Sequence, residues 1–364
     1  MRKLFMLFGF MLPIMLFFTA CNEYQGPVES STQDSQSLEK GNWNHGNSGD
    51  IVVANRNSGS ISVIDTKTDE VTGTYQLPAS PNTAEPMYVV YDKRRHRVFV
   101  GDRANNQVVV FNSNDYTVET SIPVGQGVFH MWADKLGKQL WVNNDIDNTT
   151  SVINLKTLQV IATVPTPADL VNMGGKPHDV FLGPMGRIAY ISIVGVAGAS
   201  DYVVQFNTRT FQETGRAAVG KDPHLSIPNV SRYLYVPCQN SNEVYVLNRF
   251  NMELVETISA PGAHGAIMTT NGKVFYTTNL PGGGTNGIFA INTRNNNVLG
   301  STDTPYPVPH NVAVNKSSKK LYLTHSGGTS DKVTVYSISN HNPVPVFLKE
   351  ITVELNPFGL AFAQ

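Results

Sequence analysis

The sequence predicts an all-β chain that closes into a seven-bladed β-propeller, and three observations support this fold class. A short phrase, which places a histidine at the start of an apolar strand, recurs along the chain. Its histidines His130, His178, His224, His264 and His310 follow one another at intervals of 48, 46, 40 and 46 residues, close to the length of a four-stranded propeller blade. The last residues of the chain can also supply a strand that the first unit lacks.

The recurring phrase opens each unit and is clearest at Pro177-His178. Two further copies keep the frame without the histidine, at Pro86-Met87 and at Pro357-Phe358. We therefore expect seven copies of the phrase, and in five of them a histidine at the same structural position. Met87 and Phe358 would occupy the other two places.

Three more strands are expected in each unit. In the first unit they cover residues 51–56, 60–65 and 71–77, where apolar and polar residues alternate, as in strands with one face against a neighbouring sheet. This unit has no opening strand of its own, and residues 355–364 form an opening strand without partners. Pairing the C-terminal strand with the N-terminal blade leaves no open sheet edge, as a closed propeller requires.

Composition agrees with this fold and excludes one class of partner. Thirty Gly and 21 Pro in 364 residues indicate a chain with many turns. The 27 basic and 28 acidic side chains nearly balance, so the sequence shows no footprint of a nucleic-acid-binding protein.

The N-terminus predicts export and lipidation. Arg2 and Lys3 precede an apolar run over residues 4–18, and Thr19-Ala20-Cys21 follows. Small residues before a cysteine resemble a bacterial lipobox, in which Cys21 would carry the lipid; the alternatives are a plain signal peptide or a single membrane span, for which the run is short. We expect a signal peptide over 1–20, a flexible tether over 21–48 and the propeller over 49–364.

The repeats resemble the YVTN/YncE-like propeller family. The resemblance is carried by Leu234-Tyr235-Val236, by the Asn-rich loop at residues 240–242, and by the strands at residues 244–248 and 255–258. It covers nearly the whole chain after the tether, and it implies a seven-bladed propeller. It does not imply one function, since such repeats occur in binding proteins as well as in enzymes.

A residue at the start of each opening strand should form a ring at one mouth of the central channel. His130, His178, His224, His264 and His310 would converge there, and several neutral imidazoles are good donors for a transition metal. The structural alternative is that each histidine bonds a backbone carbonyl of the next blade.

The residues around the ring favour copper over zinc or iron. Met87 on the ring and Cys238 near the same mouth are soft ligands, which copper accepts. Zinc prefers four ligands in a tetrahedron, and iron often takes a carboxylate, which the ring does not offer. Asp179 and Asp222 adjoin ring histidines and can fix their tautomers.

Other second-strand ends place candidate residues at the same mouth. Cys238 is either a ligand or a buried, inert thiol, and His325 is either a ligand or a loop histidine that bonds backbone. Arg56 and Arg103 either attract an anionic substrate or pair with Asp102 and its neighbours.

These observations favour an exported, lipid-anchored propeller that binds a transition metal and acts as a redox or lyase-type enzyme. The alternative is a non-catalytic scaffold for a protein or glycan partner, and a sugar-lactone hydrolase is a third possibility by analogy of fold. We expect a small-molecule substrate or such a partner at the mouth, no nucleic acid, a monomer, and membrane attachment through Cys21. Asn22 gives no strong inner-membrane retention signal, so the outer membrane of the cell envelope is the expected location.

Overall fold

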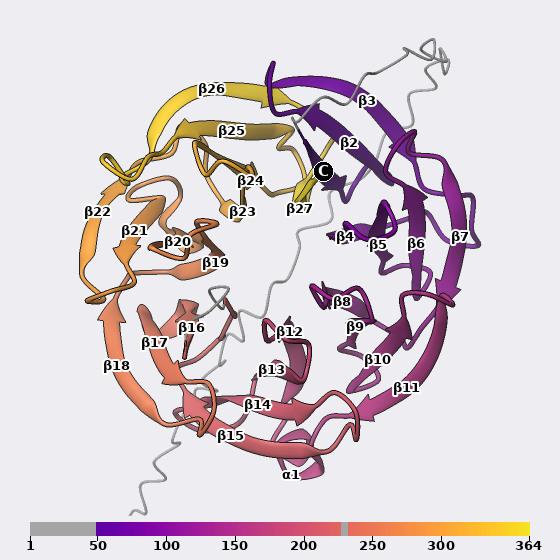
Figure 1. Cartoon of the computed structure of the whole chain (residues 1–364), viewed down its shortest axis with the longest axis vertical. Coiled ribbons are helices and arrows are strands. Elements are labelled where there is room, and N and C mark those ends of the chain that lie inside the picture. Colours follow the sequence, from indigo (N-terminus) through magenta and orange to yellow (C-terminus); the bar gives the residue numbers. More distant parts are fainter. Residues whose placement is uncertain (1–48, 227–231) are drawn as a thin grey trace, which may run out of the picture. The chain divides into compact units, whose positions relative to one another are not determined.

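The computed structural model describes residues 49–226 and 232–364, which form seven sheets around a central axis (Figure 1). The predicted closure is confirmed, because β27 (Pro357–Ala363) at the C-terminal end pairs antiparallel with β1 (Asp50–Asn55). The predicted signal peptide, Cys21 and the tether lie outside the described residues. No helix within the described ranges is both long and apolar enough to cross a membrane.

Blades 1 to 3 are regular four-stranded sheets. Blade 1 consists of β27, β1, β2 (Ser60–Asp65) and β3 (Glu70–Gln76). Blade 2 consists of β4 (Pro86–Asp92), β5 (Arg97–Asp102), β6 (Gln107–Asn112) and β7 (Val118–Pro123). Blade 3 consists of β8 (Val128–Ala133), β9 (Gln139–Asn144), β10 (Thr149–Asn154) and β11 (Gln159–Pro165).

Blades 4 to 7 follow the same plan. The short helix α1 (Ala168–Asn172) precedes blade 4, which consists of β12 (Lys176–Leu182), β13 (Ile188–Val194), β14 (Asp201–Asn207) and β15 (Glu213–Val219). Blade 5 has β16 (Tyr233–Cys238), the 3-10 turn η1 (Gln239–Ser241), β17 (Glu243–Asn248) and β18 (Leu254–Ser259). Blade 6 has β19 (Ala263–Met268), β20 (Val274–Asn279), the 3-10 turn η2 (Leu280–Gly282), β21 (Ile288–Asn292) and β22 (Val298–Thr302). Blade 7 has β23 (Pro309–Val314), β24 (Lys320–His325), β25 (Lys332–Ser337) and β26 (Val346–Thr352). In blade 5 the inner position is held by the bridges Pro223–Cys238 and Ser226–Tyr235.

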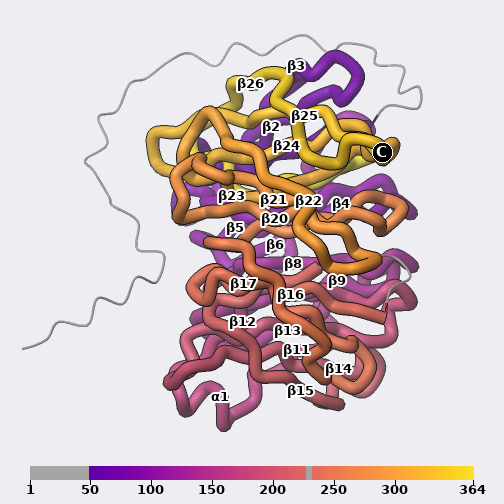
Figure 2. The backbone as a smooth tube through the Cα atoms, turned by 90° about the vertical axis from the view of Figure 1, so that its left-hand side faces the viewer, coloured from indigo at the N-terminus to yellow at the C-terminus, as the bar shows by residue number. Residues whose placement is uncertain are grey.

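The antiparallel order gives the ring two distinct faces. Each inner strand starts at one face, to which the second strand returns, as in the pairing of Pro86 with Asp102. We call this the mouth face. The turns between the first and second strands, and between the third and fourth, lie at the opposite end, which we call the far face. Figure 2 shows the blades from the side.

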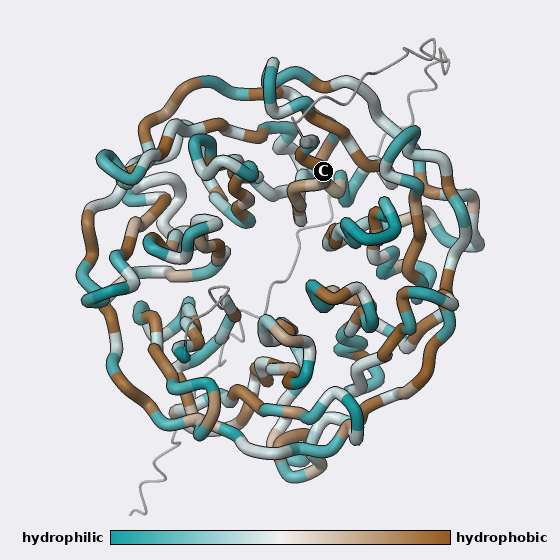
Figure 3. Tube along the Cα trace, viewed as in Figure 1, coloured by the Kyte–Doolittle hydropathy of each residue, from teal (hydrophilic) through white to brown (hydrophobic). Residues whose placement is uncertain are grey.

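Hydrophobic packing between neighbouring blades forms the core. The second and third strands are almost wholly buried, as in β1, whereas the outer strands, such as β3, are largely exposed. Figure 3 shows hydrophobic segments along the strands and hydrophilic residues in many of the turns. Apolar surface buried between sheets supplies the main stabilisation of such a fold.

Aromatic residues on the second strands add polar links between blades at the far face. The hydroxyl of Tyr190 donates to the carbonyl of Arg249 at 2.7 Å, and the hydroxyl of Tyr276 donates to that of Pro343 at 2.8 Å. In each case the acceptor lies in a turn of the following blade. In these two blades a second-strand tyrosine therefore links the blade to its neighbour.

Candidate metal centre

A β-bulge near the start of each inner strand positions the candidate residues. In blade 4, Pro177 pairs with Ile193 and Val180 pairs with Ile191, so two residues, His178 and Asp179, lie opposite the single residue between those partners. The inner strands of blades 2, 3, 6 and 7 show the same shift. A bulge turns side chains away from the regular alternation, and here it brings the two extra residues of each strand to the mouth of the channel.

The register corrects one prediction, that five histidines share the same position. His178, His264 and His310 are the first residues of their bulges, and His224 follows the bridging Pro223 in the same way. In blade 3, however, Val128 pairs with Asn144, so Phe129 is the first bulge residue and His130 is the second. Phe129 therefore joins Met87 and Phe358 at the equivalent of the histidine position, and His130 corresponds to Tyr88.

Inter-blade hydrogen bonds hold the bulges in place. The hydroxyl of Thr278 accepts from the N–H of Gly265 at 2.8 Å and donates to the carbonyl of His310 in the next blade at 3.1 Å. Thr324 does the same between Asn311 and the carbonyl of Phe358. The amide of Asn143 donates to the carbonyl of His178. These contacts fix the backbone on which the imidazoles stand.

The imidazoles pack against one another around the axis. Successive ring centroids lie 5.2 Å (His130–His178), 4.7 Å (His178–His224), 3.9 Å (His224–His264) and 4.9 Å (His264–His310) apart. Tyr88 closes the circle, because it stacks on His130 at 3.7 Å and lies 6.5 Å from His310. The predicted convergence is therefore present, with Tyr88 rather than Met87 as the member from blade 2.

Three of these histidines form a geometry suited to a metal ion. His130, His178 and His224 each offer a ring nitrogen, and the three atoms all lie within 4.8 Å of one another. The Nε2 atoms of these three residues and of His264 are buried and have no hydrogen-bond partner among the described residues. An unpaired buried polar atom costs about 1–3 kcal/mol of folding free energy. A bound ion would remove this cost by pairing with the nitrogen atoms.

An oxygen atom lies close to Nδ1 of two imidazoles. Asp179 Oδ1 lies 3.1 Å from His130 Nδ1, and Gln239 Oε1 is hydrogen-bonded to His264 Nδ1 at 2.7 Å. A proton on Nδ1 would face these oxygens and leave a lone pair on Nε2. Asp222 Oδ1 lies 3.9 Å from His178 Nε2, which is beyond hydrogen-bond distance.

Burial keeps four of the imidazoles neutral. It lowers the pKa values of His130, His224 and His264 well below their ordinary range, and neighbouring histidines add to the effect. The pKa of His310 falls to about 3, again chiefly through burial. Burial also raises the pKa of the Asp179 carboxyl to about 6. Neutral imidazoles offer their lone pairs to a metal without competition from protons at neutral pH.

The side of the mouth formed by blades 1 to 3 is aromatic. Phe129 and Phe358 stand at the first bulge position and contact Tyr88 edge-on, at 5.4 Å each. Arg56 lies 5.2 Å over the Phe358 ring, and Arg103 lies 5.6 Å over that of Phe129. The guanidinium groups also pair across blades, Arg56 with Glu85 and Arg103 with Asp145. Both arginines thus lie beside the mouth, in ion pairs.

The structure separates His325 and Cys238 from the cluster of nitrogens. His325 is buried, with Nδ1 bonded to the carbonyl of Pro307 and Nε2 to the Thr334 hydroxyl. The thiol of Cys238 is free and buried, packs in the core between blades, and has a pKa raised by burial. Met87 is buried beside the backbone of Gly359.

Sequence reasoning missed Tyr88 and Phe129. Both were overlooked because of the bulge: aligning the repeats on histidine shifts blade 3 by one residue relative to the other blades. The proline of Pro86 and Pro177 marks the paired position before the bulge, and alignment on that position would have found both. Gln239 follows Cys238 at a second-strand end, which the sequence places at the mouth, and the structure adds its hydrogen bond to His264.

Comparison with known proteins identifies relatives of the fold. The family model "Lactonase, 7-bladed beta-propeller" matches residues 43–264. No match was found among curated proteins.

Three solved structures resemble the chain. Hydrazine synthase of Kuenenia stuttgartiensis has a TM-score of 0.64 at 15% identity, covering 76% of this chain and 89% of that one. A protein of unknown function from Desulfotomaculum acetoxidans has a TM-score of 0.66 at 15% identity, covering 86% and 99%. A putative 6-phosphogluconolactonase from Bacteroides uniformis has a TM-score of 0.65 at 17% identity, covering 87% and 100%. At these identities the likeness concerns the fold.

Proposed function

The chain belongs to the lactonase family of seven-bladed β-propellers, and we propose that it binds a divalent transition-metal ion through His130, His178 and His224 and acts as a metal-dependent enzyme on a small molecule. One observation carries this proposal: three histidines converge with ring nitrogens within 4.8 Å, and their buried Nε2 atoms lack partners among the described residues. His325, by contrast, satisfies both of its nitrogens with protein partners.

The donor set favours copper, with zinc second. Cys238 is not among the three clustered residues, so a thiolate ligand no longer supports copper. What remains is the general order of affinity, in which an imidazole site binds Cu²⁺ more tightly than Zn²⁺, Ni²⁺ or Fe²⁺. Three protein ligands leave a position open for water or substrate, as in catalytic metal sites.

The family favours hydrolysis of a lactone as the reaction. A metal ion at the mouth would polarise the ester carbonyl and make a bound water a better nucleophile. Substrate would enter at the mouth face, where His178 is the most exposed of the three ligands. This reaction replaces the redox or lyase chemistry expected from the sequence, because the family match supports it directly. A scaffold that binds a protein or glycan at the same mouth is the rival.

Export and lipid attachment through Cys21 form a separate part of the proposal. They rest on the residues before the propeller, whose sequence resembles a lipoprotein signal. Membership in the narrower YVTN/YncE-like group likewise rests on the repeat phrases. Mass spectrometry of the mature protein from a bacterial membrane would test the first point, because a diacylglycerol on Cys21 adds a defined mass.

Metal content tests the central part. The full-length protein, its His178→Ala/His224→Ala variant and a His96→Ala control would be purified and their copper, zinc, iron and nickel measured. His96 is exposed in a far-face turn, so its loss removes an imidazole without touching the cluster. We expect near-stoichiometric metal in the parent and in the control, and loss of metal from the double variant with unchanged circular dichroism.

The same preparations test the reaction. Sugar and aliphatic lactones would be supplied to the metal-loaded protein, to the apo protein and to the double variant, with ring opening followed as acid release. Turnover that needs both metal and the two histidines supports the proposal. A parent that binds no metal after loading refutes the metal site, and metal without turnover would favour the scaffold.

A further inference from the structure

Charge is unevenly divided between the two faces of the propeller, although the whole chain is nearly neutral. Every blade places an exposed lysine or arginine in a far-face turn. These are Lys67, Arg94, Lys135, Arg187, Arg232, Lys273 and Lys316 in blades 1 to 7. Further exposed bases stand beside them, among them Lys138, Lys156 and Arg209. The basic residues thus encircle the whole face.

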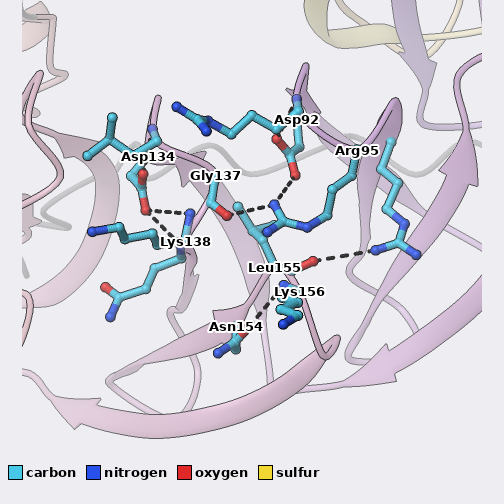
Figure 4. A network of polar contacts seen from close by, with 12 residues as sticks. Asp92, Arg95, Asp134, Gly137, Lys138, Asn154, Leu155 and Lys156 are labelled. Carbon is cyan, nitrogen blue, oxygen red and sulfur yellow. Dashed lines mark hydrogen bonds and ion pairs between the residues drawn. The ribbon is translucent and has the colours of Figure 1, made fainter.

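Several carboxylates on the far face are buried in the turns themselves. Asp134 accepts from the backbone N–H groups of Leu136, Lys138 and Gln139, and Asp92 accepts from Arg94 N–H and pairs with Arg95. Figure 4 shows this network joining the turns of blades 2 and 3, with Lys138 and Lys156 beside it. Exposed carboxylates at the far face are fewer than the exposed bases among the described residues: Glu70, Asp115, Glu119, Glu213 and Glu253. The lysine and arginine charges there are largely uncompensated.

The mouth face has the opposite balance. Its arginines and most of its lysines are paired across short distances, as in Arg103–Asp145, Lys221–Asp201 and Lys332–Asp331. Asp147, Asp303 and Glu354 are exposed there. The field of the molecule therefore points along the propeller axis, negative at the mouth and positive at the far face.

Large apolar side chains project from far-face turns of three consecutive blades. Met185 in blade 4 is 61% exposed, Phe250 in blade 5 is 59% exposed, and Leu136 in blade 3 is 38% exposed. Arg249 lies over the Phe250 ring at 4.1 Å. Exposed apolar tips among basic residues are typical of proteins that bind at a lipid interface.

We propose that the far face docks on an anionic phospholipid surface, with the histidine mouth turned away from it. A basic face to which all seven blades contribute is suited to binding an extended surface. Binding a nucleic-acid duplex would instead need basic side chains arranged along a groove or a ridge. Apolar tips that enter the interface also favour lipid over nucleic acid. Gly49 supports this orientation, because its carbonyl accepts from Thr66 in a far-face turn. The first described residue of the propeller therefore lies at the docking side.

Fluorescence quenching by lipid tests the orientation in the full-length protein. One environment-sensitive fluorophore would be attached at Met185→Cys on the far face, and in a second protein at Ile146→Cys on the mouth face. The two sites are matched in exposure, at 61% and 57%. The proteins would be incorporated in phosphatidylcholine vesicles with and without phosphatidylglycerol, each carrying a spin-labelled quencher lipid. We expect quenching at position 185 in the anionic vesicles, its loss at high salt or without phosphatidylglycerol, and none at position 146.

Two double variants with the same change in net charge distinguish an effect of this face from an effect of the net charge of the protein. Lys138→Glu/Lys156→Glu should abolish the quenching at position 185, whereas Lys176→Glu/Lys332→Glu on the mouth face, with the same change in net charge, should leave it intact. Equal quenching at both positions, or quenching independent of lipid charge, would overturn the proposal. So would duplex DNA that binds the far face while anionic vesicles fail to do so; that outcome would assign the basic face to nucleic acid.

Discussion

His325 and the clustered histidines differ at the level of single nitrogen atoms. His325 is buried and bonds both of its nitrogens, to the carbonyl of Pro307 and to the hydroxyl of Thr334. His264 bonds through Nδ1, and the Nε2 atoms of His130 and His264 are left without partners in the described structure. Sequence position alone does not reveal this difference, because it depends on which oxygen atoms the fold brings within reach.

His325 should make the protein sensitive to acid. Burial lowers its pKa to about 4, whereas in the unfolded chain it titrates near pH 6.5. Between these values the unfolded state binds a proton that the folded state does not. Stability that is present above pH 6.5 is therefore lost as the pH falls toward 4, by about 2–3 kcal/mol in all. Urea unfolding at pH 7 and pH 5 should show a smaller loss for His325→Gln than for the parent, and equal losses would contradict this assignment.

Asp179 should act on metal affinity through His130. Replacing it by Asn removes the carboxylate that lies 3.1 Å from Nδ1, and loss of a carboxylate beside a ligating imidazole typically weakens metal binding about 10- to 100-fold. Competition titration with a chelator of known affinity measures this change. Asp222→Asn is the control, because Asp222 lies 3.9 Å from His178 and should matter less. The role of Asp179 would be excluded if the two variants bound metal alike.

At the scale of the element, the bulge decides which residues reach the mouth. Two neighbouring threonines on β20 allow the hydrogen bonds that hold the bulges in place to be tested. Thr278 bonds Gly265 and His310, whereas the hydroxyl of Thr277 is buried with no partner in the described structure. Thr278→Val should therefore cost about 1–3 kcal/mol of unfolding free energy, while Thr277→Val should be nearly neutral. Denaturant unfolding compares them, and equal effects would show that the bond to the next blade contributes little.

The strands and turns could be predicted from sequence because each follows from local alternation and turn chemistry. The bulges could not, since each adds one residue to a short strand whose following residues are mainly apolar, so no clear break in alternation marks it. His130 shows the consequence. Its spacing of 48 residues from His178 is close to the 46 residues between His178 and His224, yet it occupies the second bulge position rather than the first. The ring of histidines was thus foreseen, whereas its stacking on Tyr88 needed the structure.

For the whole molecule, closure by β27 should be essential to stability. Removing residues 357–364 would leave β1 without its inner neighbour and expose the core of blade 1. We expect the cooperative thermal transition seen by circular dichroism to be lost or strongly lowered, because the ring then has an open edge. Removing Gln364 alone should have little effect. An unchanged melting temperature after the longer deletion would contradict the closed ring.

The seven blades and their closure could be predicted from the sequence because the same motif recurs along the chain. The division of charge could not be read from composition, which balances basic and acidic residues. It emerges only when each turn is assigned to a face. The family places the molecule among lactonase propellers, and the cluster at the mouth is where its chemistry is proposed to occur.

Electron paramagnetic resonance of the full-length protein loaded with one equivalent of Cu²⁺ tests the central claim most directly. Coupling to ligand nitrogens reports how many imidazoles bind the ion, whichever metal the protein holds in the cell. We predict coupling to three nitrogens in the parent and in His310→Ala, and to fewer in His130→Ala, His178→Ala and His224→Ala. A spectrum of loosely bound copper in the parent, or one altered by His310→Ala but not by His178→Ala, would contradict the site.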